Sequence, residues 1–149
     1  MTRMTKLTGL CLLMAGAAAA QFGMTGPKLQ YRAVSETDAV HAGAETRVAF
    51  TFKLSQGWHV NAHRPLDEFL IPTELTLEED AAFTVAGIAY PKQKEIKLAF
   101  SPEPLAVYEQ TFVIGAVLRL AEGLAPGPVV IHGSLRYQAC NDAQCAPPQ

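Results

Sequence analysis

One stretch of this 149-residue sequence decides its fold class: Thr46-Arg47-Val48-Ala49-Phe50-Thr51-Phe52-Lys53-Leu54. Apolar side chains recur at every second position, at Val48, Phe50, Phe52 and Leu54, with polar or small residues between them. A period of two residues places those four side chains on one face of an extended chain. The stretch therefore predicts a β-strand with one face buried in a core.

Similar short runs lie on both sides of this stretch, and turn residues such as Gly, Pro and Asp separate them. We expect strands at Leu29–Val34, Trp58–Ala62, Pro72–Leu77, Phe83–Tyr90, Ala106–Leu120 and Val129–Ala139, of which Ala106–Leu120 is the longest. After the first 20 residues, no window of a dozen residues shows the 3.6-residue period of an amphipathic helix. This spacing predicts an all-β protein, an immunoglobulin-like antiparallel β-sandwich.

The N-terminus has the parts of a secretory signal. Arg3 and Lys6 supply positive charge, an apolar run follows over 7–20, and small residues at Ala18 and Ala20 offer a cleavage site before Gln21. The run is shorter than the ~20 residues that a membrane-spanning helix needs. We therefore expect a cleaved signal peptide over 1–20, export to the periplasm or otherwise out of the cytoplasm, a flexible leader over 21–28 and one domain over 29–149.

Composition limits the partners of the exported chain. Removing 1–20 takes away two of the 12 basic residues and none of the 14 acidic ones, so the net charge becomes −4. No basic cluster remains, which argues against binding to nucleic acid or to an anionic membrane surface. About 130 residues are enough for one domain with its own hydrophobic core.

Two cysteines remain after the signal, Cys140 and Cys145, at the end of the last expected strand. They flank the four-residue loop Asn141–Gln144, and Asn and Asp suit a tight turn because their side chains satisfy nearby backbone groups. Opposed residues of an antiparallel pair have Cα atoms ~4.5–5.5 Å apart, which a disulfide accepts. The pair is therefore predicted to form a local disulfide across a hairpin.

Three interpretations of this cysteine pair remain open from the residues alone. A loop of ~6 residues makes a weak staple, worth only about 2 kcal/mol, and a loop tip is accessible to an attacking thiolate, so a redox site is favoured over a structural bridge. A metal site is the third, because His59 and His63 have zinc-ligand spacing. Residues four apart on a strand are about 13 Å apart, which disfavours chelation of one ion.

The segment Leu135-Arg136-Tyr137-Gln138-Ala139-Cys140-Asn141-Asp142-Ala143-Gln144-Cys145-Ala146-Pro147-Pro148 resembles a known family. It is similar to the active-site segment of the N-terminal periplasmic domain of the thiol:disulfide interchange protein DsbD. Upstream, Gly57–Asn61 and Pro65–Pro72 are similar to further segments of that family. The resemblance covers roughly 29–148, and it favours the redox interpretation.

The resemblance implies an immunoglobulin-like sandwich that relays electrons through the Cys140–Cys145 pair without a bound cofactor. It implies a thioredoxin-like electron donor, thioredoxin-like acceptors and an association with a membrane redox domain. One cysteine forms the mixed disulfide with the partner, which we expect to be Cys145, and the other resolves it. The family continues past the position of Gln149, so we expect the final strand to be missing here.

The resemblance also indicates neighbours of the cysteines. A cap loop with a shielding aromatic residue is expected in Lys92–Leu105, with Phe100 as that residue. The family's tyrosines near the site are replaced around His59 and Asn61, and Tyr137 precedes Cys140 by three positions. Asp142 lies between the cysteines, and its negative charge disfavours thiolates, so we expect thiol pKa values at or above about 8.5.

Overall fold

The computed structural model describes residues 29–98 and 103–149. Their ten strands are β1 (Leu29–Ser35), β2 (Glu45–Leu54), β3 (His59–Asn61), β4 (Glu74–Leu77), β5 (Phe83–Ala89), β6 (Lys94–Ile96), β7 (Leu105–Glu109), β8 (Thr111–Leu120), β9 (Gly133–Arg136) and β10 (Ala139–Cys140). These residues contain no helix, and so none that could cross a membrane. The expected signal peptide and leader lie outside the described residues.

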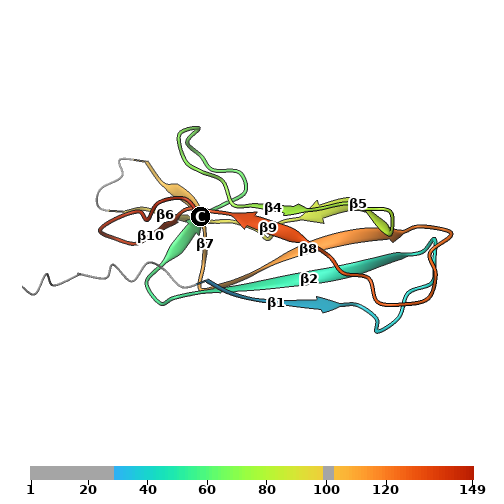
Figure 1. Cartoon of the computed structure of the whole chain (residues 1–149). Coiled ribbons are helices and arrows are strands. Elements are labelled where there is room, and N and C mark those ends of the chain that lie inside the picture. Colours follow the sequence, from blue (N-terminus) through green and yellow to red (C-terminus); the bar gives the residue numbers. More distant parts are fainter. Residues whose placement is uncertain (1–28, 99–102) are drawn as a thin grey trace, which may run out of the picture.

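The strands form three sheets, and every strand pairing is antiparallel. The first sheet has the order β1-β2-β8-β5, the second β10-β3-β7-β6, and the third is the pair β4-β9. Figure 1 shows the first sheet running along the molecule, while β6, β7 and β10 gather at the end that carries the C-terminal hairpin. The predicted all-β antiparallel sandwich is confirmed.

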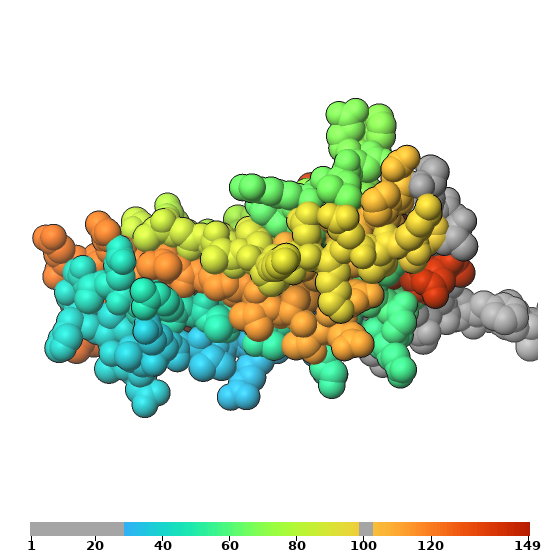
Figure 2. All heavy atoms as spheres, turned by 180° about the vertical axis from the view of Figure 1, so that it is seen from behind, coloured from blue at the N-terminus to red at the C-terminus, as the bar shows by residue number. Residues whose placement is uncertain are grey.

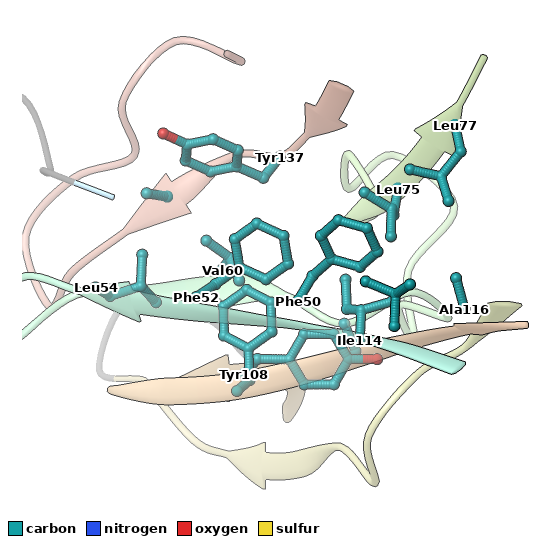
Figure 3. Packing of buried hydrophobic residues seen from close by; sticks show 14 of the residues in the cluster. Phe50, Phe52, Leu54, Val60, Leu75, Leu77, Tyr108, Ile114, Ala116 and Tyr137 are labelled. Carbon is teal, nitrogen blue, oxygen red and sulfur yellow. The ribbon is translucent and has the colours of Figure 1, made fainter. Parts of the chain in front are cut away.

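The core lies between the sheets, and β2 supplies the residues that its alternation predicts. Val48, Phe50, Phe52 and Leu54 are all buried, while Glu45 and Lys53 are exposed. Figure 3 shows Phe50 and Phe52 between the strands of the first sheet and the side chains contributed by β4. Removing such large apolar side chains from water is the main favourable term in folding, so this face holds the layers together.

An aromatic stack joins the first sheet to the second. The ring of Phe112, on β8, stacks on Phe52 of β2 with the ring centroids 5.3 Å apart. Phe112 also stacks on Tyr108 of β7, with the ring centroids 5.2 Å apart. Ring pairs at these separations are attractive beyond the area that they bury. The stack therefore fixes the second sheet, which carries the cysteines, against the body of the sandwich.

The expected single strand over Ala106–Leu120 is wrong, because the chain changes sheets at Gln110. Gln110 has a φ of 52°, and its carbonyl accepts a hydrogen bond of 2.7 Å from the backbone N–H of Leu54. A positive φ is uncommon for a residue with a side chain, and it turns the chain sharply. The segment before Gln110 is β7 of the second sheet, and the segment after it is β8 of the first.

The expected strand over Val129–Ala139 is also divided. Its middle part is β9, which pairs with β4, and its end is β10, which pairs with β3. β6, which was not expected as a strand, forms the edge of the second sheet beside β7. The division of the last segment matters for function, because it delivers the cysteines to a different sheet from β9.

Candidate functional site

Cys140 and Cys145 form the predicted disulfide. The S–S distance is 2.06 Å and the two Cα atoms are 3.9 Å apart, closer than the expected separation of opposed residues. Cys140 belongs to β10 at the edge of the second sheet, and Cys145 forms an isolated antiparallel bridge with it. Figure 2 shows the red C-terminal segment at the surface, at one end of the molecule. The disulfide therefore spans an edge hairpin at that end of the sandwich.

The hairpin forms because Asn141 organises its turn. The Asn141 side-chain oxygen accepts hydrogen bonds of 2.9 Å from the backbone N–H groups of Ala143 and Gln144. Backbone bonds from Asn141 to Gln144 and from Ala146 to Ala139 flank the two cysteines. The cysteines thus occupy a non-hydrogen-bonded pair, where opposed side chains approach most closely. This local geometry sets the two sulfurs within bonding distance.

The two cysteines differ in their access to solvent. Cys140 is only 2% exposed, because it lies between β3 and the returning chain, whereas Cys145 is exposed on the outer arm of the hairpin. Thiol–disulfide exchange begins when a thiolate reaches one sulfur along the S–S axis, so access decides which sulfur is attacked. The geometry favours Cys145 for contact with another molecule.

A row of three side chains crosses the second sheet at the level of the disulfide. Cys140 of β10 lies opposite His59 of β3, and His59 lies opposite Glu109 of β7. Opposed residues in antiparallel strands point to the same face, with Cβ atoms about 4.5–5.5 Å apart. The neighbouring row, Ala139, Val60 and Tyr108, belongs to the hydrophobic core. The cysteine row therefore lies on the face turned away from that core.

His59 is buried in this row and its Nε2 has no hydrogen-bond partner. Burial lowers the pKa of His59 below its usual 6.5, and the negative charges of Glu109 and Asp142 oppose this shift. Glu109 itself forms an ion pair with Lys94 of β6, with Nζ and Oε2 2.9 Å apart. The imidazole is consequently neutral at neutral pH, and its buried nitrogen is free to accept or donate a proton.

Asn61, two residues further along β3, holds the following loop against the sheet. Its side-chain Nδ2 donates a 2.9 Å hydrogen bond to the backbone carbonyl of Ile71, and its backbone carbonyl accepts a 2.6 Å hydrogen bond from the Thr73 hydroxyl. Asn61 and Thr73 are almost fully buried. Asn61 thus closes the base of the loop over 62–73, and its expected place near the site is a supporting one.

The other predicted neighbours fall on different sides of the hairpin. Tyr137 packs into the hydrophobic core, where burial raises its pKa, so it supports β10 from the side opposite Cys140. Asp142 is exposed in the turn, and its charge reaches His59. Phe100, the predicted shield, lies outside the described residues, and its role stays a prediction. Sequence reasoning missed Glu109, for which the only signal was an acidic residue ending an apolar run.

His59 and His63, the pair considered as metal ligands, have separate environments. The ring of His63 stacks on Tyr90 with centroids 3.7 Å apart, and its Nδ1 lies 3.2 Å from the carbonyl oxygen of Thr73. Over 29–98 and 103–149, no group of three or more His, Cys, Asp or Glu side chains is placed to hold one metal ion.

A groove lies away from the disulfide. It holds about 760 Å³ and is lined mainly by apolar residues of the segments 33–42 and 124–131, with Val48 and Leu118 also contributing. In Figure 1 these segments lie at the opposite end of the sandwich from the C-terminal hairpin. The groove is therefore separate from the site built around Cys140 and Cys145.

Together, the fold and the site define a β-sandwich domain with a disulfide at one end, and one of the two bonded cysteines, Cys145, is exposed. The profile of the family described as "Thiol:disulfide interchange protein DsbD, N-terminal" matches residues 30–149. The chain belongs to this family, a family of thiol–disulfide exchange domains. No curated protein sequence matches the chain at a significant level.

Two solved structures resemble the chain. The N-terminal periplasmic domain of ScsB from Proteus mirabilis superposes with a TM-score of 0.53 at 15% identity, covering 81% of this chain and 44% of that one. The N-terminal domain of Neisseria meningitidis DsbD in the reduced form gives a TM-score of 0.43 at 18% identity, covering 72% and 74%. The chain thus spans less than half of the ScsB structure, with which it shares its fold.

Proposed function

We propose that this domain relays electrons by cycling between the Cys140–Cys145 disulfide and the corresponding dithiol. The observation that carries the proposal is the difference in exposure between the two cysteines: Cys140 is 2% exposed and Cys145 is open to solvent. A staple needs no accessible sulfur, whereas an exchange site needs one sulfur for the partner and a second one held behind it. The family membership supports the same chemistry.

The exchange takes place in two steps. A thiolate of the reduced partner attacks Sγ of Cys145, the S–S bond breaks, and Cys140 leaves as a thiolate that takes up a proton. The partner's second thiolate then attacks its own sulfur in the mixed disulfide, and Cys145 is released and protonated. The partner ends oxidised and this domain reduced by two electrons. Run in reverse, with Cys145 attacking, the same steps reduce an oxidised acceptor.

We propose thioredoxin-like proteins or domains as both the donor and the acceptors, and a membrane redox domain as an associate. A partner with two cysteines matches the two-electron capacity of this site, and both electrons travel in the sulfur pair, so the relay calls for no bound cofactor. The proposal places the domain in the periplasm after cleavage behind Ala20. N-terminal sequencing of the secreted protein should then begin at Gln21.

The test reacts each of two single-cysteine variants of this domain with a thioredoxin whose second active-site cysteine is replaced by serine. One of the two reacting proteins is first converted to a mixed disulfide with an aromatic thiol. Cys140→Ser leaves Cys145 free, and we expect this variant to form a covalent complex with the thioredoxin rapidly. Cys145→Ser leaves the buried sulfur, and we expect complex formation to be slower by at least about tenfold. Non-reducing electrophoresis and mass spectrometry measure both rates. Equal rates, or a preference for Cys140, would contradict the proposed order.

The reduction potential separates the relay from the alternative, a secreted immunoglobulin-like binding domain with a purely structural disulfide. Structural disulfides have potentials below about −300 mV, whereas exchangeable ones are less negative. We expect equilibration with glutathione buffers to give a value above that limit. A potential that glutathione cannot reach would favour the structural alternative.

A further inference from the structure

We propose that His59 takes the proton from the Cys140 thiol when Cys140 resolves the mixed disulfide on Cys145. The inference rests on the proposed function and deepens it, because it assigns a proton-handling residue to the resolving step. Its basis is a buried imidazole directly opposite a buried cysteine, on the face of the sheet turned away from the core.

The position of His59 is set by strand register. Cys140 and His59 are a register pair between β10 and β3, so their side chains leave the sheet on the same face with Cβ atoms about 4.5–5.5 Å apart. Val60, the next residue of β3, is fully buried in the core and pins this register. A slip by one residue would take Val60 out of the core, so the core holds His59 opposite Cys140.

The Nε2 atom of His59 is buried without a hydrogen-bond partner. An unpaired buried polar atom is costly, so each one in a native protein calls for an explanation, and a catalytic role is one of these. In the oxidised state Cys140 carries no proton and offers no strong partner. Reduction creates an S–H group on Cys140, the register partner of His59, and this group can serve the orphaned nitrogen as a partner in the reduced state alone.

The surrounding charges suit a proton acceptor. Glu109 lies opposite His59 on β7 and is paired with Lys94 of β6, while Asp142 in the hairpin turn also acts on the imidazole. Desolvation is the largest influence and keeps His59 neutral, and the two carboxylates favour the imidazolium once a proton arrives. His59 is thus a neutral base whose protonated form has two anionic neighbours.

The proposed step balances as follows. Before the step, His59 is in the tautomer whose Nε2 carries no proton. With Cys145 joined to the partner, the proton of Cys140 moves from its Sγ to Nε2 of His59. The Cys140 thiolate attacks Sγ of Cys145, the bond between Cys145 and the partner sulfur breaks, and the partner sulfur leaves with the electron pair. The imidazolium then passes its proton to water or to the departing thiolate. In the opposite direction the imidazolium returns a proton to Cys140.

Ellman's reagent, an aromatic disulfide, separates the two steps on the reduced mature protein that begins at Gln21, in which Cys140 and Cys145 are the two cysteines. Cys145 attacks the reagent and releases the first coloured thiolate, and Cys140 then resolves the mixed disulfide and releases the second. Near pH 7 a thiol with an ordinary pKa of about 8.5 is only ~3% ionised, so a base can accelerate the resolving step at most about 30-fold. We expect His59→Gln to slow the second phase about tenfold and to leave the first phase within about twofold.

The pH profile distinguishes proton transfer from a merely structural role. In the wild type the second-phase rate should be nearly flat between protonation of His59 and ionisation of Cys140, because the proton only moves within the pair. In His59→Gln it should rise about tenfold per pH unit below the thiol pKa. The matched control is His132→Gln, a change at an exposed histidine, which should keep the wild-type profile.

Different results reject different statements. A missing first phase, with Cys145 inert, would reject the proposed relay itself. A normal first phase, with an unchanged rate and pH profile of the second phase in His59→Gln, would overturn only the role of His59. The wild type offers a measurement that needs no folded His59 variant: the imidazole C–H resonances of reduced protein should report the ionisation of Cys140 and lose this response in Cys140→Ser. Identical titrations in both proteins would also overturn the proposal.

Discussion

Reducing the Cys140–Cys145 bond should leave the sandwich folded and lower its free energy of unfolding by about 2 kcal/mol. In the chain-entropy model, a cross-link closing ~6 residues contributes about 7 cal/mol/K, or about 2 kcal/mol near room temperature. The bond closes a sequence separation of only five residues at the edge of one sheet. The main core, which lies on the other face of β10, does not depend on it.

The hairpin also keeps its own hydrogen bonds without the disulfide. The Asn141 side chain still closes the turn, Ala146 still donates to Ala139, and Gln149 and Tyr137 exchange backbone bonds of 2.9 and 3.2 Å. Reduced protein should therefore retain the cysteine arm in place, as a domain that works in both redox states requires.

The assay is urea unfolding of the oxidised and the reduced protein, followed by circular dichroism and by the fluorescence of Trp58, the single tryptophan. Trp58 packs against the core directly before β3, so its emission reports the second sheet. The β-sheet spectrum should be the same in both states, and the midpoint should shift without a large change in slope. Loss of the β-sheet spectrum on reduction, or a loss of more than about 4 kcal/mol, would refute this reasoning and indicate a structural staple.

Three further outcomes are expected. Burial depresses the pKa of His59 below 6.5, so the unfolded chain binds a proton before the folded one as the pH falls. The free energy of unfolding should therefore fall from about pH 6.5 downward. Urea titrations of His59→Gln should lack this fall, and those of His132→Gln should keep it. Gly133→Ala should lower the melting temperature, because a Cβ there would lie 2.6 Å from a backbone oxygen of β4, whereas Gly115→Ala meets nothing within 4 Å and should be nearly neutral. With Asp142 beside the cysteines, alkylation of the reduced protein should follow a pKa at or above about 8.5, and a thiolate already formed near pH 6 would contradict this.

Sequence reasoning found the elements whose alternation is complete and missed the places where the chain changes sheets. β2 has an apolar residue at every second position from Val48 to Leu54, and all four are buried as expected. The run through Gln110 looked continuous because Tyr108 and Phe112 keep the same period on both sides of it. The usable signal was the polar Gln110 itself, at a position where the period places a buried side chain.

The cysteine site was predictable as a local motif and not as a three-dimensional neighbourhood. Spacing and turn chemistry are properties of adjacent residues, so the hairpin and its disulfide followed from Cys140, Asn141 and Cys145. The opposition of His59 and Glu109 depends on how β3 registers with β7, which non-local packing sets. β6 was missed because Lys94-Glu95-Ile96 is a short, charged edge strand with no buried alternation to reveal it.

Strand alternation also explains how one small sheet serves both stability and redox chemistry. Along β10 and β3, Ala139 and Val60 point into the core, while Cys140 and His59 occupy the same strands one position away and leave on the opposite face. Cys140 and His59 are thus each next in the chain to a core residue. That core residue fixes their position, while their own side chains stay outside the core. A bond between sulfurs on the outer face can therefore open and close while the inner face stays packed. Because the two faces are separate, the stability of the sandwich and the reactivity of the disulfide can be measured independently. The small loss of stability expected on reduction is a consequence of the same separation.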